Sequence, residues 1–154
     1  MESELGHGTK FSIYLPRAKS AAAASSQKAT NKDIRGRETI LVAEDERAIR
    51  LLTTRFLREL GYVVLEAGSG EEALSVAESH VGDIHVLLTD LTMPKMNGKE
   101  LAIQICARRP TTRIVITSGL AERDENNPSD WTFVDKPYSP NQLATHLRSV
   151  LDGE

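Results

Sequence analysis

Five short apolar segments recur along most of the chain, and amphipathic segments separate them. The apolar segments are rich in β-branched residues and begin about twenty residues apart, a spacing typical of alternating strands and helices. We predict strands at residues 39–45, 62–67, 84–90, 113–118 and 131–136. Because these segments are apolar throughout, we expect both faces of their sheet to be covered.

Helical periodicity fills most of the gaps between the predicted strands. Apolar residues three or four positions apart predict helices at residues 46–60, 70–79, 98–109 and 139–151. The first helix has a predicted inward face made of Ile49, Leu52, Phe56 and Leu60. Gly61 then ends this helix. Regular alternation of this kind predicts an α/β fold, a doubly wound parallel sheet with helices on both faces.

The two ends of this regular region have a different composition. Residues 17–37 are small, polar and basic, with almost nothing to bury, so they predict a flexible linker before a folded domain at residues 38–154. Residues 119–130, between the fourth and fifth strands, are acidic and interrupted by Pro128. They lack an apolar stripe, so we expect the fourth helix to be short or missing.

Bulk composition narrows the possible settings and partners. The chain has 154 residues, 40% of them hydrophobic, which is enough for one domain with a core. Its net charge is −3 and its charges are scattered, so we expect no nucleic-acid binding. No apolar run is long enough to span a membrane, and the single cysteine, Cys106, cannot form an internal disulfide. We expect a cytoplasmic monomer without membrane contact by this segment.

Polar and charged residues stand where four of the predicted strands end. Glu44 and Asp45 end the first strand, Asp90 the third, Ser118 the fourth and Lys136 the fifth. In doubly wound sheets, ligands bind beyond the carboxyl ends of the strands, where the strand order reverses. Crowded carboxylates repel unless a hard cation such as Mg²⁺ bridges them. One carboxylate could then act as a nucleophile toward a phosphoryl group, with the hydroxyl and the ammonium binding its oxygens.

With these residues in this order, residues 38–152 resemble the receiver domain of two-component response regulators. The resemblance implies a flavodoxin-like sheet of five parallel strands in the order 2-1-3-4-5. It also implies that Asp90 is the phospho-acceptor and that Mg²⁺ is the cofactor. Asp45 and Asp90 would bind the metal directly, Glu44 would act mainly through water, and the main-chain carbonyl of Thr92 would be a further ligand.

The same resemblance assigns the remaining site residues and the partners. Ser118 would be the switch hydroxyl, Phe133 the aromatic switch residue and Lys136 the lysine that pairs with the phosphoryl group. Asp90, Ser118 and Lys136 would then catalyse phosphorylation and dephosphorylation of the domain itself. The expected phosphodonor is a histidine kinase or a histidine phosphotransfer domain.

The segment before the linker carries a separate resemblance. Residues 6–16, GHGTKFSIYLP, alternate apolar and polar side chains as an edge strand does. They are similar to the last glycine box and final strand of a sensor histidine kinase ATP-binding domain. Residues 1–16 would then be a remnant of such a domain. The chain would be the C-terminal piece of a hybrid histidine kinase, a parent protein that could be anchored to a membrane. An unrelated polar tail is the alternative.

Two other functions use a similar arrangement of residues. Phosphohydrolases of the haloacid dehalogenase type also carry an aspartate nucleophile and Mg²⁺ at a strand end, but they need a second aspartate two positions later, where this chain has Thr92. A pseudo-receiver would serve only as an interaction domain. The complete set of site residues favours a phosphorylated receiver over both.

Overall fold

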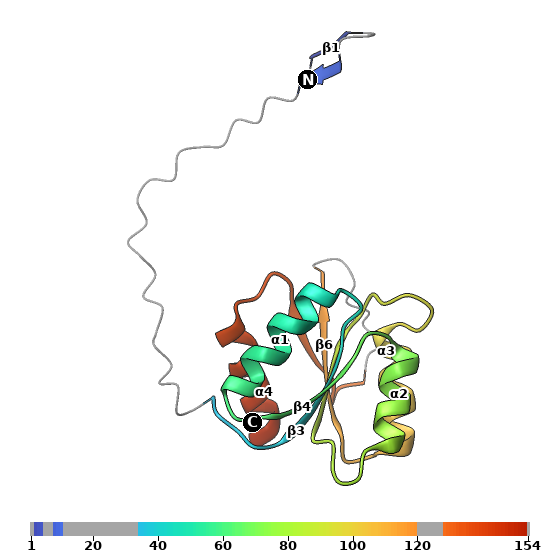
Figure 1. Ribbon diagram of the computed structural model, residues 1–154, viewed down its shortest axis with the longest axis vertical. Helices are drawn as coiled ribbons and strands as arrows, with labels where there is room; N and C mark the ends of the chain where they lie inside the picture. The colour runs from blue at the N-terminus through green and yellow to red at the C-terminus, as the bar shows by residue number, and fades with distance from the viewer. Residues whose placement is uncertain (1, 5–7, 11–33, 120–127, 154) are drawn as a thin grey trace.

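The computed structural model describes residues 2–4, 8–10, 34–119 and 128–153 (Figure 1). Near the N-terminus, β1 (Glu2–Glu4) and β2 (Gly8–Lys10) pair antiparallel. From residue 39 onward, strands and helices alternate as predicted. They are β3 (Thr39–Ala43), α1 (Arg47–Glu59), β4 (Val63–Ala67), α2 (Gly70–Ser79), β5 (Val86–Asp90), α3 (Gly98–Arg108), β6 (Arg113–Ser118), β7 (Thr132–Asp135) and α4 (Pro140–Asp152).

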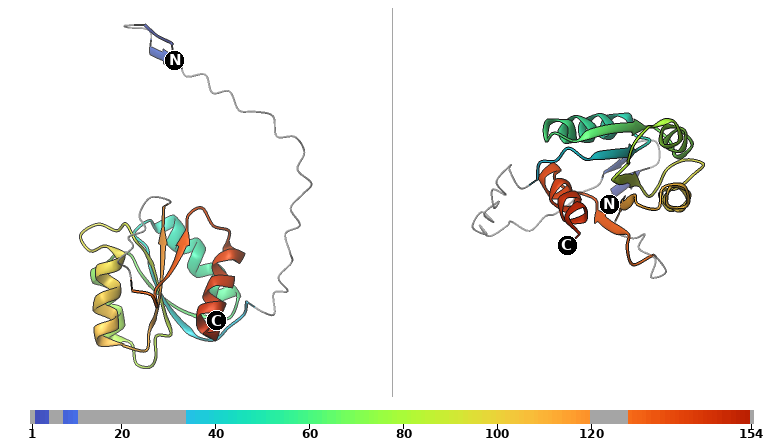
Figure 2. Two further views of the ribbon diagram at one scale, coloured as in Figure 1. Left: turned by 180° about the vertical axis from the view of Figure 1, so that it is seen from behind. Right: turned by 90° about the horizontal axis from the view of Figure 1, so that it is seen from below.

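The strands β3 to β7 form one parallel sheet in the order β4-β3-β5-β6-β7. Numbered from β3, this is the order 2-1-3-4-5, so the predicted topology is confirmed. Figures 1 and 2 show α1 and α4 on one face of the sheet and α2 and α3 on the other. The order reverses between β3 and β5, which places a crevice for ligands at the carboxyl ends of these two strands.

Each face of the sheet has its own hydrophobic core. Because side chains alternate along a strand, Ile40 and Val42 of β3 face one core while Leu41 and Ala43 face the other. The first core is completed by residues of α1 and α4, including Leu57, Leu143 and Leu147. The second is completed by residues of α2 and α3, including Ala73, Ala77, Leu101 and Ile105. Two-sided burial explains why these strands are apolar throughout.

The predicted inward face of α1 is wrong at one position. Leu52 is 71% exposed, whereas the sheet-facing side of α1 buries Thr54 and Leu57. The physical reason is helix geometry: residues two positions apart lie about 200° apart around a helix, so Leu52 is almost opposite the buried Thr54 and faces away from the sheet. The stripe through Ile49, Leu52 and Phe56 lines a groove beside the start of α4 instead of the centre of the core.

The packed unit begins earlier than the predicted boundary at residue 38. Ile34 is only 3% exposed and belongs to the core between the sheet and the helices α1 and α4. The Tyr62 hydroxyl donates a hydrogen bond to the Ile34 carbonyl at 3.1 Å, and the Gly36 N–H donates to the Leu60 carbonyl at 3.2 Å. Residues 34–37 of the predicted linker are therefore part of the fold.

Other predictions for the irregular segments fall outside the described residues. Residues 17–33 of the linker and residues 11–16 of the kinase-like remnant are among them, and so are residues 120–127, where the fourth helix was expected to be short or missing. In the part of the chain that the structure describes, no helix is both long enough and apolar enough to traverse a bilayer.

Candidate functional site

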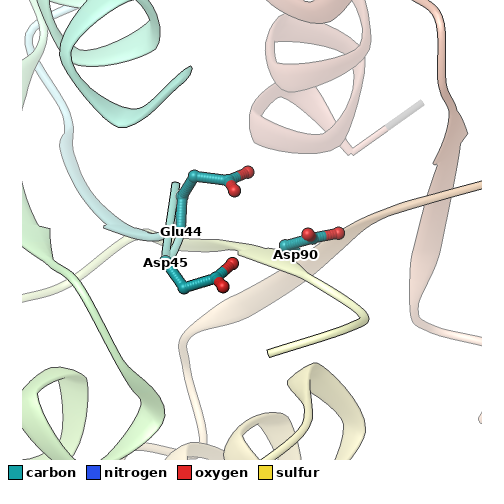
Figure 3. Close-up of side chains that lie close together, drawn as sticks. All are labelled: Glu44, Asp45 and Asp90. Atoms are coloured by element: carbon teal, nitrogen blue, oxygen red, sulfur yellow. The ribbon is translucent and has the colours of Figure 1, made fainter. Parts of the chain in front are cut away.

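Three carboxylates meet at the crevice where the strand order reverses. Glu44 and Asp45 directly follow β3, and Asp90 is the last residue of the neighbouring strand β5 (Figure 3). One carboxylate oxygen of each residue lies within 4.8 Å of those of the other two. The predicted convergence of these residues is therefore present in the fold.

Lys136 enters the same crevice from the end of β7. Its Nζ lies 3.1 Å from Oδ1 of Asp90 and 3.5 Å from Oε2 of Glu44. Burial lowers the pKa of Lys136, but the hydrogen bond with Asp90 and the charges of Asp90 and Glu44 outweigh it, so that its pKa is raised. Lys136 therefore stays positively charged at neutral pH and contacts Asp90, the predicted phospho-acceptor.

The environment of Glu44 differs from that of its neighbour Asp45. Glu44 is 5% exposed, and burial raises the pKa of its carboxyl group, with the charge of Lys136 opposing and that of Asp90 adding to this shift. Asp45 is exposed at the mouth of the crevice. Asp45 and the half-buried Asp90 are therefore the more accessible of the three carboxylates, and Glu44 is the least accessible.

The donor set suits a hard divalent cation. Three carboxylates and one ammonium leave an excess of negative charge, and all the clustered donor atoms are oxygens, which Mg²⁺ prefers. Thr92 lies two residues beyond Asp90 and is exposed. Thr92 therefore belongs to the loop that leads from the end of β5 to the start of α3.

Gly98 brings the start of α3 close to the end of β5. Its N–H donates a 2.9 Å hydrogen bond to the Leu91 carbonyl. A Cβ atom at this position would collide with the main-chain carbonyl of Asp90. Glycine is therefore required for the loop to close tightly behind the site, and Asn97 at its end caps α3 through a capping box with Glu100.

Ser118 has an unusual hydrogen-bonding state. It ends β6, one residue beyond the Thr117 that pairs with Asp90, and it is 1% exposed. Within the described residues, its Oγ is the one buried side-chain oxygen or nitrogen without a hydrogen-bond partner. Leaving a hydroxyl unsatisfied costs about 1–3 kcal/mol, so its presence calls for a role.

The remaining predicted residue, Phe133, lies on β7. It is partly buried, pairs in register with Ile116 of β6 and packs against the core beneath α2 and α3.

Arg50 makes a contact with the site that the sequence did not predict. Its guanidinium binds the main-chain carbonyls of Glu44 and Asp45, and the available signal was a basic residue in the first turn of a helix.

The raised pKa of Glu44 leads to a stability prediction. A carboxyl group whose pKa is higher in the fold than in the unfolded chain favours the fold when protonated, so its ionised form destabilises the metal-free protein at neutral pH. Glu44→Gln, which mimics the protonated acid, should raise the melting temperature at pH 7 by a few degrees. Thermal melts in a chelator should show this gain shrinking as the pH falls, and vanishing below about 4.5, where both states are protonated. A gain independent of pH would contradict this assignment.

Sequence comparisons place the chain among known proteins. The family model of the response regulator receiver domain matches residues 40–148. The sensor kinase CckA of Brucella abortus is 37% identical over 98% of this chain, which covers 17% of that kinase. The transcriptional regulatory protein PdtaR of Mycobacterium tuberculosis is 34% identical over 74% of this chain and 57% of its own length. The chain thus spans only part of each of these relatives.

Solved structures agree with the sequence comparisons. The receiver domain of the hybrid histidine kinase CckA shares 35% sequence identity, with a TM-score of 0.64 over 73% of this chain and 98% of that domain. A response regulator receiver protein from Sinorhizobium medicae shares 28% identity, with a TM-score of 0.68 over 75% of this chain and 95% of its own. The chain belongs to the response regulator receiver domain family of two-component signal transduction.

Proposed function

We propose that this receiver domain accepts a phosphoryl group on Asp90 from a phosphohistidine. A carboxylate oxygen of Asp90 attacks phosphorus, the phosphorus–nitrogen bond breaks, and the leaving imidazole keeps the electron pair and takes a proton. Asp45, Asp90 and the Thr92 carbonyl would hold Mg²⁺, and Glu44 would act through water. When bound, Mg²⁺ supplies positive charge that offsets the carboxylate repulsion and stabilises the transferred oxygens.

Two observations at the end of the strand carry this proposal: Lys136 contacts Asp90, and the buried hydroxyl of Ser118 follows Thr117, the residue that pairs with Asp90. Lys136 already contacts Asp90 at 3.1 Å and stays charged, so it can pair with the added negative charge. The buried Ser118 hydroxyl has no hydrogen-bond partner among the residues that the structure describes, so it can donate to a phosphoryl oxygen once one is present. Movement of Ser118 toward that oxygen would open space for Phe133 to turn inward, which is the proposed switch.

The alternatives lack support from comparable contacts. A phosphohydrolase needs a general acid two positions after the nucleophile, and Thr92 has no ionisable group there. A pseudo-receiver would have no need for a charged lysine in contact with Asp90, or for a buried hydroxyl at the end of the neighbouring strand that has no partner among the described residues.

One experiment separates these functions. The chain is incubated with Mg²⁺ and acetyl phosphate, and its intact mass is measured. We expect one added phosphoryl group in the unaltered chain and none in Asp90→Asn. Steady release of phosphate from unrelated phosphate esters would support the hydrolase instead, and an unchanged mass would support the pseudo-receiver.

We also propose a docking surface for the phosphodonor. An apolar groove of about 620 Å³ lies between α1 and the start of α4 and reaches Lys136 at one end. Its apolar lining includes Leu52, Phe56, Pro137, Tyr138, Pro140 and Leu143. A phosphohistidine must reach Asp90 beside Lys136, so the helix that carries it in a histidine kinase or a histidine phosphotransfer domain would lie along this groove. We also propose that the domain acts as a monomer in the cytoplasm, as part of a hybrid histidine kinase.

Leu52 provides a test of this groove. Because its side chain is 71% exposed, Leu52→Asp should leave the fold intact but should slow phosphotransfer from a phosphohistidine protein by about tenfold, the loss typical of one interface contact of 1–2 kcal/mol. Labelling by acetyl phosphate should stay unchanged. Ile103→Asp is the matched control, because Ile103 is a 60% exposed residue of α3 on the opposite face of the sheet. Equal transfer rates for both variants would exclude the groove as the docking surface.

A further inference from the structure

Arg50 lies in the first turn of α1, half-buried behind the acidic residues of the site. Its Nη1 lies 2.5 Å from the main-chain oxygen of Glu44 and 3.4 Å from that of Asp45. Both contacts are to carbonyl groups, so the guanidinium binds the main chain of the acidic pair and leaves the carboxylate oxygens free. The contact belongs to the site without occupying its ligand atoms.

The position of Arg50 is unfavourable for the helix itself. The N-terminal end of a helix carries a partial positive charge, which disfavours cations in the first turn. The first turn of α1 contains no acidic residue, and its N-cap residue, Glu46, makes no side-chain capping bond. By contrast, α2 and α3 each have an acidic first turn and a capping side chain. Helix stability therefore does not explain a cation at this position.

Residues 44–46, which we call the acidic loop, need a contact that holds their main chain in place. Three carboxylates within 4.8 Å of one another repel, and Asp45 is exposed on a short connection between β3 and α1. The Glu44 N–H donates to the Ala67 carbonyl at 3.2 Å, and the Glu46 N–H donates to Oε1 of Glu44 at 3.3 Å. Neither bond reaches the Asp45 carbonyl, to which the Arg50 side chain donates.

Gly68, at the end of β4, makes room for the guanidinium. A Cβ atom at this position would lie 3.1 Å from Nη1 and 3.3 Å from Cζ of Arg50, closer than ordinary side-chain contacts. The Gly68 N–H donates a 2.7 Å hydrogen bond to Oε2 of Glu72 in the first turn of α2. Arg50 is thus held between the acidic loop and the β4–α2 loop.

We propose that Arg50 is a positioning residue that sets the Mg²⁺ affinity of the acidic site, because it holds the main chain of Glu44 and Asp45 with their carboxylates converging on Asp90. This inference rests on the proposed Mg²⁺ site. The proposal and simple electrostatics predict opposite effects on the Mg²⁺ affinity when Arg50 is removed. Loss of a nearby positive charge alone would tighten cation binding, whereas loss of the positioning contact weakens it.

The test is direct Mg²⁺ binding to the unphosphorylated chain, measured by calorimetry in Arg50→Met. We expect the dissociation constant to rise about tenfold, within the range for groups that orient metal ligands. Arg47→Met is the matched control, because Arg47 is an exposed residue of the same helical turn and its loss removes the same charge. It should bind Mg²⁺ as tightly as the unaltered chain or more tightly. In Arg50→Met, phosphorylation should need about tenfold more Mg²⁺ but should reach a similar rate at saturation.

Gly68→Ala tests the same contact without a change of charge and guards against misfolding of Arg50→Met. The added Cβ would lie 3.1 Å from Nη1 of Arg50 and 3.3 Å from Oε2 of Glu72, so both side chains must shift by a few tenths of an ångström. Because this shift loosens the contact of the guanidinium with the main chain of Glu44 and Asp45, this variant should also bind Mg²⁺ more weakly than the unaltered chain, by less than Arg50→Met. An unchanged or tighter Mg²⁺ affinity in Arg50→Met, or in Gly68→Ala should the first variant fail to fold, would overturn the inference. Failure of the unaltered chain to bind Mg²⁺ would instead contradict the proposed metal site, so the two failures are distinguishable.

Discussion

Asp45→Asn should abolish phosphorylation of Asp90. The amide keeps the size and shape of the side chain but removes a negative charge from the donor set, and Asp45 is the most accessible of the three clustered acids. A divalent cation that loses a charged ligand binds far more weakly. Without the cation, Lys136 alone opposes the repulsion among the phosphodonor, Asp90 and Glu44. Intact mass after incubation with Mg²⁺ and acetyl phosphate should show no added phosphoryl group.

Glu46→Gln is the matched control for this result. Glu46 is the exposed acid next in sequence to Asp45, but it lies outside the cluster of three carboxylates. Its loss removes the same charge from the same loop, so it should leave labelling nearly unchanged. If Asp45→Asn were labelled as fast as Glu46→Gln, Asp45 would not be a metal ligand.

The second large effect is expected at Ile34, in the segment predicted from composition to be linker. Ile34→Ala should lower the free energy of unfolding by about 2–4 kcal/mol, because it leaves a cavity in the core between the sheet and the helices α1 and α4. A loss of this size should lower the melting temperature by roughly 10 °C. Thermal melts followed by circular dichroism would measure it.

Two truncations serve as controls for the Ile34 result. Deletion of residues 1–33 keeps Ile34 and the Gly36–Leu60 hydrogen bond, so it should leave the melting temperature nearly unchanged. Deletion of residues 1–37 removes both, together with the acceptor of the Tyr62 hydroxyl, and should destabilise the domain at least as much as Ile34→Ala. Equal melting temperatures for the two truncations would show that the contacts of residues 34–37 contribute nothing.

The fold could be predicted from local patterns because its signals are local. Each strand of the sheet is a short apolar run, and each described helix of that unit has its own periodicity. The capping residues Ser69, Asn97 and Ser139 all accept hydrogen bonds from the third residue of the helices they precede. In a parallel sheet the carboxyl ends of the strands share one edge, so the meeting of Glu44 and Asp45 with Asp90 followed from the strand assignments alone.

Packing between distant segments decided what these patterns could not. Leu52 looked like a core residue by its spacing, but α1 turns Thr54 and Leu57 toward the sheet, which leaves Leu52 exposed at the rim of a groove. Ile34 stands in a polar segment. Two hydrogen bonds from far along the chain nevertheless hold this segment against the core: one joins Gly36 to Leu60, and the other joins the Ile34 carbonyl to Tyr62. Neither outcome is encoded in the local periodicity of either segment, because burial depends on which surfaces meet in space.

The sequence by itself determined the α/β architecture, the strand ends and the identity of the charged groups gathered there. The tertiary structure alone decided how those groups are held: Arg50 on the main chain of the acidic pair, Gly98 against the Asp90 carbonyl, and the Ser118 hydroxyl buried with no partner in the described part of the chain. Each of these depends on distances between segments that lie apart in sequence. Residue type and spacing name the chemistry of a site, but only the packed fold sets its hydrogen bonds and its burial.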